Sequence, residues 1–321
     1  MKALVVHKYG SVDNLQFSEV DKPIPEDHEV LVKVKATSVN FNNLIIVTGK
    51  PFIGRIFSGL FSPNGKIPGN DVAGQVEAVG ENVKKFKIGD EVFGDIIEYG
   101  GSTFAEYVCV PEEGLLLKPE NLSFEESAVV PEAGLVALQA LMDHGNLKPG
   151  EKVLIYGASG GIGTFAVQLA KVYGAEVTGV CSGKNADLVR SIGADHTIDY
   201  TRKDFLDYGP SFDLIIATVG YRPIRDYKKA LKPAGRYIAT GGTMKQIIEA
   251  NVYGSKSSKG EQRKLAGMSV IPNKDLSQLK SLIEAGKVRP VIDTSYPFDS
   301  ISDALKHYGT GHSRGKIAIY M

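Results

Sequence analysis

The feature that most restricts the fold of this chain is a glycine-rich turn between a strand pattern and a helix pattern, "KVLIYGASGGIGTFAVQLAK" at 152–171. Glycines in such a turn let the backbone approach a pyrophosphate, and free amides at the helix start bind its oxygens. A turn made for packing alone is the alternative, but inside a strand–helix–strand unit the pattern predicts a dinucleotide site. The residues expected to hold the phosphates are Ala158, Ser159, Gly160, Gly161, Ile162 and Gly163.

The patterns on either side of this turn indicate two kinds of domain. Residues 1–122 carry short strand patterns broken by Gly and Pro, which predict an antiparallel, barrel-like domain. From 123 to 270 strands alternate with helices, which predicts a parallel, doubly wound sheet, and Ser123 with Glu126 is expected to cap its first helix. Residues 271–321 are expected to return to the first domain. The predicted fold class is α/β, a β-barrel domain plus a Rossmann-type domain.

Composition excludes several classes of function. Lys plus Arg and Asp plus Glu are equal at 37 each, so no basic field favours nucleic acid. Two cysteines cannot form a disulfide framework and suggest a reducing compartment. The chain lacks a signal-peptide pattern and an apolar run long enough to span a bilayer. We therefore expect a cytoplasmic protein without an integral membrane segment, and leave peripheral membrane contact open.

The end of the second strand of the Rossmann pattern predicts which dinucleotide binds. An NAD site places a carboxylate about 20 residues after the glycines, where it binds the ribose 2′-hydroxyl. Here "VTGVCSGKN" offers Cys181, Ser182 and Lys184 instead. A hydroxyl and a cation suit a 2′-phosphate, so the expected cofactor is NADPH. The alternative is that Ser182 only caps the helix near Asn185 and Lys184 is solvated.

Six segments, in order along the whole chain, resemble the medium-chain dehydrogenase/reductase superfamily. They are "PGNDVAGQVEAVG", "GDEVFG", "PEAGLVALQAL", "GASGGIG", "GADHTIDY" and "GKIAI". The resemblance implies a GroES-like catalytic domain with an inserted Rossmann domain, and is closest to the zinc-free quinone oxidoreductase and alkenal reductase branch. Where zinc-dependent members have Gly-His-Glu, this chain reads Gly69-Asn70-Asp71, and no cysteine lies near Val39–Phe41. With only Cys109 and Cys181 elsewhere, we expect no metal.

The resemblance and the missing ligands together predict the reaction. Without a Lewis acid, oxidation of simple alcohols is poorly supported, whereas hydride addition to a quinone or to an α,β-unsaturated carbonyl needs only orientation and hydrogen bonds in a dry cleft. Candidate catalytic residues are Asn40, Asn43, Glu132 and Tyr99. Asn40 could instead be a turn residue, and Glu132 a helix cap. A metal-free alcohol or aldehyde dehydrogenase, or a non-catalytic NADPH-binding redox sensor, remains the alternative function.

The resemblance also assigns cofactor contacts at the carboxyl ends of the Rossmann strands and in the tail. They are Tyr200, Val219, Gly220, Gly241, Gly242 and Lys316. Tyr200 would lie near the adenosine 2′-phosphate, unless it is an ordinary core or surface aromatic, and Lys316 near the diphosphate. A homodimer is expected from the resemblance alone.

The apolar segment at 49–66, "GKPFIGRIFSGLFSPNGK", has a structural and a functional reading. It packs into a core or against a partner subunit, or it walls an apolar substrate pocket. We favour the pocket wall because the resemblance implies that this loop lies beside the cleft.

Overall fold

The computed structural model describes residues 1–63, 66–220, 222–241, 264–268 and 270–321. They form two compact units. Unit 1 comprises Met1–Glu132, Pro272–Glu284 and Pro290–Met321; unit 2 comprises Ala133–Ile271 and Ala285–Arg289. The unit boundary therefore lies at 132/133, ten residues beyond the boundary expected at 122/123, and a five-residue segment of the tail belongs to unit 2.

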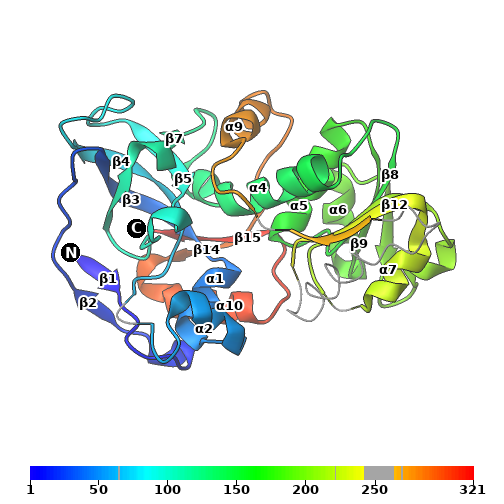
Figure 1. Cartoon of the computed structure of the whole chain (residues 1–321), viewed down its shortest axis with the longest axis horizontal. Coiled ribbons are helices and arrows are strands. Elements are labelled where there is room, and N and C mark those ends of the chain that lie inside the picture. The colour runs from blue at the N-terminus through cyan, green and yellow to red at the C-terminus, as the bar shows by residue number, and fades with distance from the viewer. Residues whose placement is uncertain (64–65, 221, 242–263, 269) are drawn as a thin grey trace. The chain divides into compact units, whose positions relative to one another are not determined.

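Unit 1 is built on a seven-stranded sheet whose strands come from both ends of the chain (Figure 1). The order is β14-β15-β3-β4-β5-β7, with β6 also paired to β3, and β1 and β2 form a separate antiparallel pair. The strands are β1 (Lys2–Leu4), β2 (Phe17–Glu19), β3 (Glu29–Ser38), β4 (Asp71–Val79), β5 (Glu91–Asp95), β6 (Tyr107–Pro111), β7 (Leu116–Leu117), β14 (Ile292–Pro297) and β15 (Lys316–Tyr320).

The helices of unit 1 are short and follow the strands at their ends. They are α1 (Phe41–Thr48), α2 (Arg55–Ser58), α3 (Phe124–Ala128), α9 (Leu276–Glu284) and α10 (Ile301–Gly309), with the 3-10 turn η3 at Ile97–Tyr99. Two separate apolar cores stabilise the unit. One packs α10 and β15 under the amino-terminal strand around Phe104 and Phe298, and the other lies between β3, β4, β5 and β6 around Val32 and Phe86.

One predicted helix is interrupted in the structure. The capping box at Ser123 forms as expected, since Ser123 Oγ accepts from the Glu126 amide at 3.1 Å and Glu126 Oε2 accepts from the Ser123 amide at 3.1 Å. The helix ends at Ala128, however, and a new helix α4 begins at Pro131 (Pro131–Gln139). Proline disfavours a helical conformation in the residue before it and cannot donate to the preceding turn. The break places Glu132 in the first turn of α4.

Unit 2 has a six-stranded, fully parallel sheet in the order β10-β9-β8-β11-β12-β13. This order doubles back between β8 and β11, as in a doubly wound sheet, so the predicted fold class is confirmed. Its elements are β8 (Lys152–Tyr156), α5 (Gly161–Val172), β9 (Glu176–Cys181), α6 (Ala186–Ser191), β10 (His196–Asp199), β11 (Phe212–Ala217), α7 (Ile224–Ala230), β12 (Leu231–Ala239) and β13 (Lys264–Gly267).

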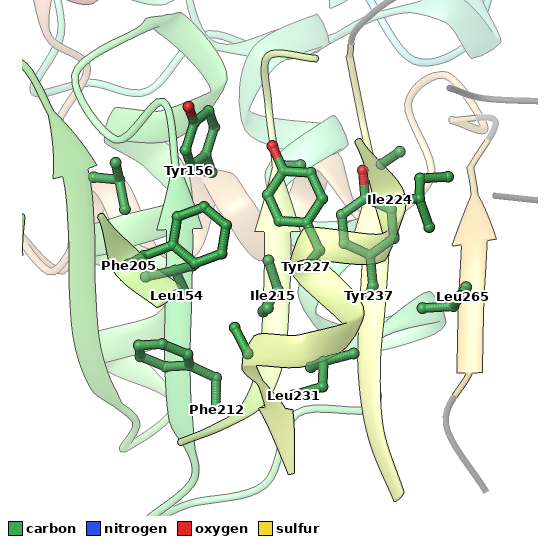
Figure 2. Close-up of a cluster of buried hydrophobic side chains, with 14 of the residues drawn as sticks. Leu154, Tyr156, Phe205, Phe212, Ile215, Ile224, Tyr227, Leu231, Tyr237 and Leu265 are labelled. Atoms are coloured by element: carbon green, nitrogen blue, oxygen red, sulfur yellow. The ribbon is translucent and has the colours of Figure 1, made fainter. Parts of the chain in front are cut away.

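An aromatic core fills one face of the unit 2 sheet (Figure 2). Tyr227 stacks on Phe205 and Tyr237, with ring centroids 5.5 and 4.8 Å apart, and meets Tyr156 edge-on at 5.6 Å. Figure 2 shows the hydroxyls of Tyr156, Tyr227 and Tyr237 directed toward the same end of the sheet, the end where the strands finish. Rings of this size bury much apolar area, so this core stabilises the sheet edge that would meet a ligand.

Candidate functional site

The glycine loop of unit 2 is tied to its sheet and leaves its helix start open. The amides of Gly157 and Ala158 donate to the Val180 carbonyl of β9 at 3.1 and 3.0 Å. The first helical bond runs from the Thr164 amide to the Gly160 carbonyl at 2.9 Å. The amides that begin α5 precede any full helical turn, so they are free to donate to an anion at the positive end of the helix dipole.

Two glycines of this loop are needed for different reasons. A Cβ on Gly163 would lie 2.1 Å from the Gly157 carbonyl oxygen, so only glycine allows α5 to pack this closely on the loop. A Cβ on Gly160 would meet nothing closer than that same oxygen at 3.5 Å. The protein's own packing therefore does not require glycine at 160, whereas a ligand phosphate against the backbone does.

Asn185 adds a contact that the sequence analysis missed. Its Nδ2 donates to Ser159 Oγ at 3.0 Å, which links the turn after β9 to the glycine loop. The side chain is buried, yet its Oδ1 has no partner among the described residues. An unpaired buried acceptor is costly unless a ligand donates to it. The free amides and the open space at Gly160 fit the phosphates of a ligand, and the orphaned oxygen fits a hydroxyl or amino group of the same ligand.

The residues predicted to read a 2′-phosphate lie side by side at the ends of β9 and β10. Cys181 pairs with Asp199, and the Tyr200 amide donates to the Cys181 carbonyl at 3.2 Å, so Ser182 and Tyr200 follow adjacent strands. Ser182 precedes the 3-10 turn η6 (Gly183–Asn185), but its hydroxyl makes no capping bond, so the alternative role as a cap is not seen. Lys184 is exposed, and within the described ranges it has no ion-pair partner.

One carboxylate also lies at this end of the site. Asp199, on the strand next to β9, accepts from the Thr201 amide at 3.0 Å and from its hydroxyl at 2.7 Å. These bonds and the Gly183 amide lower the pKa of Asp199, so the group is charged at neutral pH. The sequence analysis found no carboxylate after β9 because this one comes from β10. Its charge opposes that of Lys184 toward a phosphate.

A pocket of about 340 Å³ opens beside Tyr200. Its lining includes Tyr156 and Phe205, two aromatic residues of the core in Figure 2, together with three cations and one carboxylate. The carboxylate, Asp204, is paired with Arg222 at 2.5 Å. The lining residues are Tyr156, Val180, Tyr200, Arg202, Lys203, Asp204, Phe205 and Arg222. Three cations around this pocket suit a phosphorylated ligand, and no sequence pattern predicted Arg202, Lys203 or Arg222 at this site.

The remaining cofactor residues follow β11 and β12. Val219 and Gly220 come directly after β11, beside the Thr218 hydroxyl, which donates to the Tyr156 carbonyl at 3.0 Å. Gly241 follows β12, and a Cβ there would lie 2.2 Å from the Thr218 carbonyl oxygen. The predicted contact at Gly242 lies outside the described residues. The described members therefore share the carboxyl edge of the sheet with the glycine loop.

Unit 1 contains a buried cluster of polar side chains, which we call the unit 1 polar cluster. It gathers residues from the ends of β3 and β5, the starts of α1 and β4, α4 and the first position of β15. Its members are Ser38, Asn40, Asn43, Asn70, Asp71, Asp95, Glu132 and Lys316. The cluster brings together three of the four predicted catalytic residues, Asn40, Asn43 and Glu132.

Asp71 is the charged centre of this cluster. It accepts from Ser38 Oγ at 2.6 Å, from Asn40 Nδ2 at 2.8 Å and from the Glu132 amide at 2.9 Å. The Lys316 ammonium lies 3.6 Å from its Oδ2 and also donates to Asn40 Oδ1. A fully buried carboxylate is stable only with such partners, so Asp71 is the group that uses the positive charge of Lys316.

Asn70 bridges the other two carboxylates. Its Nδ2 donates to Asp95 Oδ1 at 3.1 Å and to Glu132 Oε2 at 2.9 Å. Its Oδ1 accepts from Asn40 and Asn43 at 3.2 and 3.3 Å, which fixes the direction of the amide. A reversed amide would set its oxygen against both carboxylates. Neither Asp95 nor Glu132 has an ion-pair partner in the part of the chain that the structure describes.

This arrangement favours a proton on the Asp95 and Glu132 pair. Burial, then the charge of Asp71, raises the pKa of Glu132 to about 7. Burial, then Asp71 and Glu132, raises the pKa of Asp95 well above its ordinary value. The two carboxylates share one amide donor and interact, so the pair titrates as a unit and holds a proton near neutral pH. Glu132 is the partly exposed member and is able to exchange that proton.

Comparison with known proteins identifies the family of this architecture. Residues 26–120 match the model of the alcohol dehydrogenase GroES-like domain, and residues 192–319 match that of the zinc-binding dehydrogenase. The chain is 34% identical to the chloroplast envelope quinone oxidoreductase homolog of Arabidopsis thaliana, over 99% of this chain and 98% of that protein. It is 37% identical to the 2-methylene-furan-3-one reductase of Solanum lycopersicum, over 100% and 79%.

A solved structure agrees with these relatives over its full length. The quinone oxidoreductase from Coxiella burnetii has a TM-score of 0.90 at 30% identity, and the match covers 100% of this chain and 99% of that one. The chain belongs to the medium-chain dehydrogenase/reductase superfamily. Its relatives place it in the quinone oxidoreductase and alkenal reductase-like branch, as the sequence motifs predicted.

Within this superfamily the unit 1 polar cluster includes the position of a zinc ligand in the metal-dependent members. The triplet Gly69-Asn70-Asp71 puts an amide where those proteins have an imidazole, and the Asn70 nitrogen faces two carboxylates. Among the residues that the structure describes, no group of three or more His, Cys, Asp or Glu side chains is arranged to hold a metal. An amide that donates to its neighbours presents no lone pair to a cation, so this donor set does not fit tetrahedral zinc.

Two predicted residues lie apart from their expected places. Lys316, expected at the cofactor diphosphate, donates to Asn40 and to the Val39 carbonyl at 3.3 Å within unit 1, so its cofactor role stays a prediction. Tyr99 lies in η3 beside Gly114, and its burial and the charges of Glu98 and Glu113 raise its pKa. None of the contacts that Tyr99 makes with described residues joins the unit 1 polar cluster.

A different tyrosine, Tyr308, is affected by the charge of the unit 1 polar cluster. Burial, followed by the charge of Glu132, raises the pKa of Tyr308 on α10. No sequence pattern pointed to Tyr308, because it lies 176 positions beyond Glu132 in a helix with an ordinary amphipathic pattern. Among the described helices, none has the length and apolar character to cross a bilayer.

Proposed function

We propose that this protein is an NADPH-dependent reductase of quinones or α,β-unsaturated carbonyls that works without a bound metal. The observation that carries the proposal is the open glycine loop of unit 2, followed after β9 by a hydroxyl and by a cation that has no ion-pair partner among the described residues. The relatives support the acceptor class: they are named quinone oxidoreductases, a 2-methylene-furan-3-one reductase and an NADPH-dependent alkenal/one oxidoreductase.

Unit 2 supplies the coenzyme site in this proposal. The first amides of α5 bind the diphosphate, and Ser182 and Lys184 bind the 2′-phosphate with Tyr200 beside them. The pocket beside Tyr200, with its three cations, receives the adenosine end of the coenzyme. NADPH, when bound, supplies the hydride that reduces the acceptor.

Unit 1 supplies the proton. Reduction of an enone adds a hydride at the β-carbon and a proton at the α-carbon, so enone, NADPH and H⁺ give the saturated carbonyl and NADP⁺. Reduction of a quinone likewise consumes one hydride and one proton to give the hydroquinone. Glu132 donates that proton from Oε1, the carboxyl oxygen that Asn70 leaves unbonded.

Asn40 and Asn43 act as positioning residues. Both polar atoms of the Asn40 side-chain amide already have hydrogen-bond partners within the cluster. The Asn43 Oδ1 accepts from the backbone N–H of Asn40 at 2.7 Å. Both side chains are almost fully buried. They orient Asn70, which in turn orients Glu132. Asn40 and Asn43 were predicted to act directly in catalysis, but in this proposal they act indirectly, through Asn70. Tyr99 has no role in the proposed mechanism.

A substrate panel tests the function. The purified chain is given NADPH or NADH with a benzoquinone, a short 2-alkenal, a saturated aldehyde and, in reverse, a primary alcohol with NADP⁺, each with and without a chelator. We expect NADPH oxidation with the quinone or the alkenal, unaffected by the chelator. Turnover of only the saturated aldehyde and the alcohol would favour the dehydrogenase alternative. Tight NADPH binding with no turnover would favour a redox-sensing protein.

Two further predictions belong to this proposal rather than to the observations. We propose that the protein is a homodimer, and that it is cytoplasmic, as its cysteine content suggests. The curated relatives carry chloroplast and mitochondrial names, so location is open to direct test by fractionation of the source cells. Sedimentation velocity measures the subunit number.

A further inference from the structure

A surface of unit 1 combines exposed apolar side chains with cations, and the polar cluster makes no use of it. We call it the 41–66 surface. Five of its large apolar side chains are exposed, and the most exposed, Phe61, has 88% of its surface accessible. They are Phe41, Phe52, Ile56, Leu60 and Phe61. Single exposed apolar residues are ordinary, but five within 21 positions are more than scattered exposure accounts for.

The charge of this stretch is one-sided although the whole chain is neutral. No Asp or Glu occurs anywhere from Val30 to Asn70, whereas the 41–66 surface carries Lys50, Arg55 and Lys66. The 37 acidic residues of the chain are therefore absent from the part that exposes these aromatic and aliphatic side chains. A surface that is both apolar and cationic complements a surface that is both apolar and anionic.

Local contacts hold the guanidinium of Arg55 among the apolar side chains of this surface. The Arg55 guanidinium lies over the rings of Tyr9 and Phe52, at 4.4 and 5.0 Å from their centroids, and its Nε donates to the Gly49 carbonyl at 3.1 Å. The Tyr9 hydroxyl in turn bonds Ser58 Oγ at 2.7 Å. These contacts anchor α2 and fix the position of Arg55, so the surface needs little ordering to bind a partner.

Three candidate partners of the 41–66 surface differ in how they complement its positive charge. A second copy related by a two-fold axis would place the same patch against itself and bring Lys50, Arg55 and Lys66 toward their own equivalents. A small apolar acceptor would leave the cations unmatched. A bilayer with anionic headgroups neutralises the cations and takes up the apolar side chains at the level of the acyl boundary.

We propose that the 41–66 surface docks this protein on an anionic lipid bilayer. Phe52, Ile56 and Phe61 enter the interface, and Lys50, Arg55 and Lys66 contact lipid phosphates. Binding of this kind is peripheral and reversible, and it weakens as salt screens the headgroups. The residues that carry it belong to unit 1, whereas the proposed coenzyme site belongs to unit 2.

Vesicle sedimentation of the full chain tests this proposal. The vesicles are phosphatidylcholine alone or an equal mixture with phosphatidylserine. We expect binding only to the mixture, lost at high salt. The paired substitution Ile56→Ser and Phe61→Ser should weaken binding about 30-fold, as expected for the loss of about 2 kcal/mol. The matched control is Ile88→Ser, because Ile88 is 66% exposed like Ile56 but lies elsewhere in unit 1.

Charge reversal separates the two parts of the surface. Lys50→Glu with Lys66→Glu should abolish binding to the mixed vesicles while leaving the apolar residues intact. The proposal is overturned if mixed vesicles fail to bind the parent chain, or if the Ile88 control weakens binding as much as the paired substitution. It is also overturned if the paired substitution converts a dimer to a monomer in sedimentation velocity, since the occupant is then a second copy.

Discussion

The glycine loop of unit 2 presents backbone groups to a ligand, whereas the unit 1 polar cluster consists of side chains. The loop needs only a strand, a tight turn and a helix start that are contiguous in sequence, from 152 to 172. The cluster needs residues from 38 to 316 and depends on the closure of a seven-stranded sheet. A backbone site tolerates most side-chain changes except at its glycines, while a side-chain site is sensitive at every member. Four predictions test this difference.

The largest effect is expected at Glu132. Glu132→Gln keeps an acceptor for Asn70 but removes the proton, so kcat with an enone should fall about a thousandfold, within the range of general acid catalysis. In the parent chain the donor is the protonated form, present below its pKa of about 7 and lost above it. The parent rate should therefore fall as pH rises through 7, whereas the residual rate of the variant should not. An unchanged pH profile in the variant would remove Glu132 from the mechanism.

A smaller but still large effect is expected at Gly163. In Gly163→Ala the new methyl lies 2.1 Å from the Gly157 oxygen, so α5 must shift. We expect NADPH binding to weaken about 100-fold, with a loss of about 2 kcal/mol in the free energy of unfolding. In the matched variant Gly160→Ala the methyl has room, so binding should weaken while urea unfolding stays unchanged. Equal loss of stability in both would show that packing alone explains the two glycines.

An intermediate effect is expected at Lys184. Lys184→Ala should lower the preference for NADPH over NADH about tenfold, the loss of one charge-assisted hydrogen bond. Asp199→Asn should shift the preference toward NADPH, because it removes the opposing charge. Kd values for both coenzymes by fluorescence titration measure the ratio, and Lys148→Ala, exposed elsewhere in unit 2, is the control. A ratio unmoved in Lys184→Ala would contradict the assigned 2′-phosphate site.

The smallest effect is expected at Tyr227. Its hydroxyl is buried and has no hydrogen-bond partner in the described part of the chain, so Tyr227→Phe should leave the free energy of unfolding unchanged or slightly raised. Tyr9→Phe is the comparison in unit 1, because the Tyr9 hydroxyl bonds Ser58, and it should cost about 1 kcal/mol. Urea unfolding of both variants measures the difference. A large loss in Tyr227→Phe would show that the hydroxyl has a partner.

The same contrast explains what the sequence could predict. The loop, the strand alternation and the residues after β9 depend on neighbours in the chain, so period and spacing located them. The carboxylate of Asp199 was not predicted at the 2′-phosphate site, because it comes from the adjacent strand. Glu132 and Asn40 were named one by one from the resemblance, but the bridge through Asn70 depends on distances between segments, which no pattern encodes. For the same reason Lys316 was assigned to the cofactor, and its contact with Asp71 was not foreseen.

Two local features of the structure were also not predicted from the periodicity of the sequence. The expected helix after Ser123 stops at Ala128 because Pro131 cannot continue the hydrogen bonding of the preceding turn. The break is visible in the sequence once the proline is given weight over the apolar periodicity. The cationic rim at Arg202, Lys203 and Arg222 had no such signal, since these residues are spread over a loop and the segment after β11.

The pairing of β15 with β3 joins residues about 280 positions apart. Lys316, the first residue of β15, is the only cation within reach of Asp71 in the described chain. During synthesis the amino-terminal part emerges first and waits on the ribosome for many seconds. Until Lys316 is in place, Asp71 lacks its counter-charge. We therefore expect a chain truncated before β15 to keep this part of the sheet open, because closing it would bury the Asp71 carboxylate without a cation.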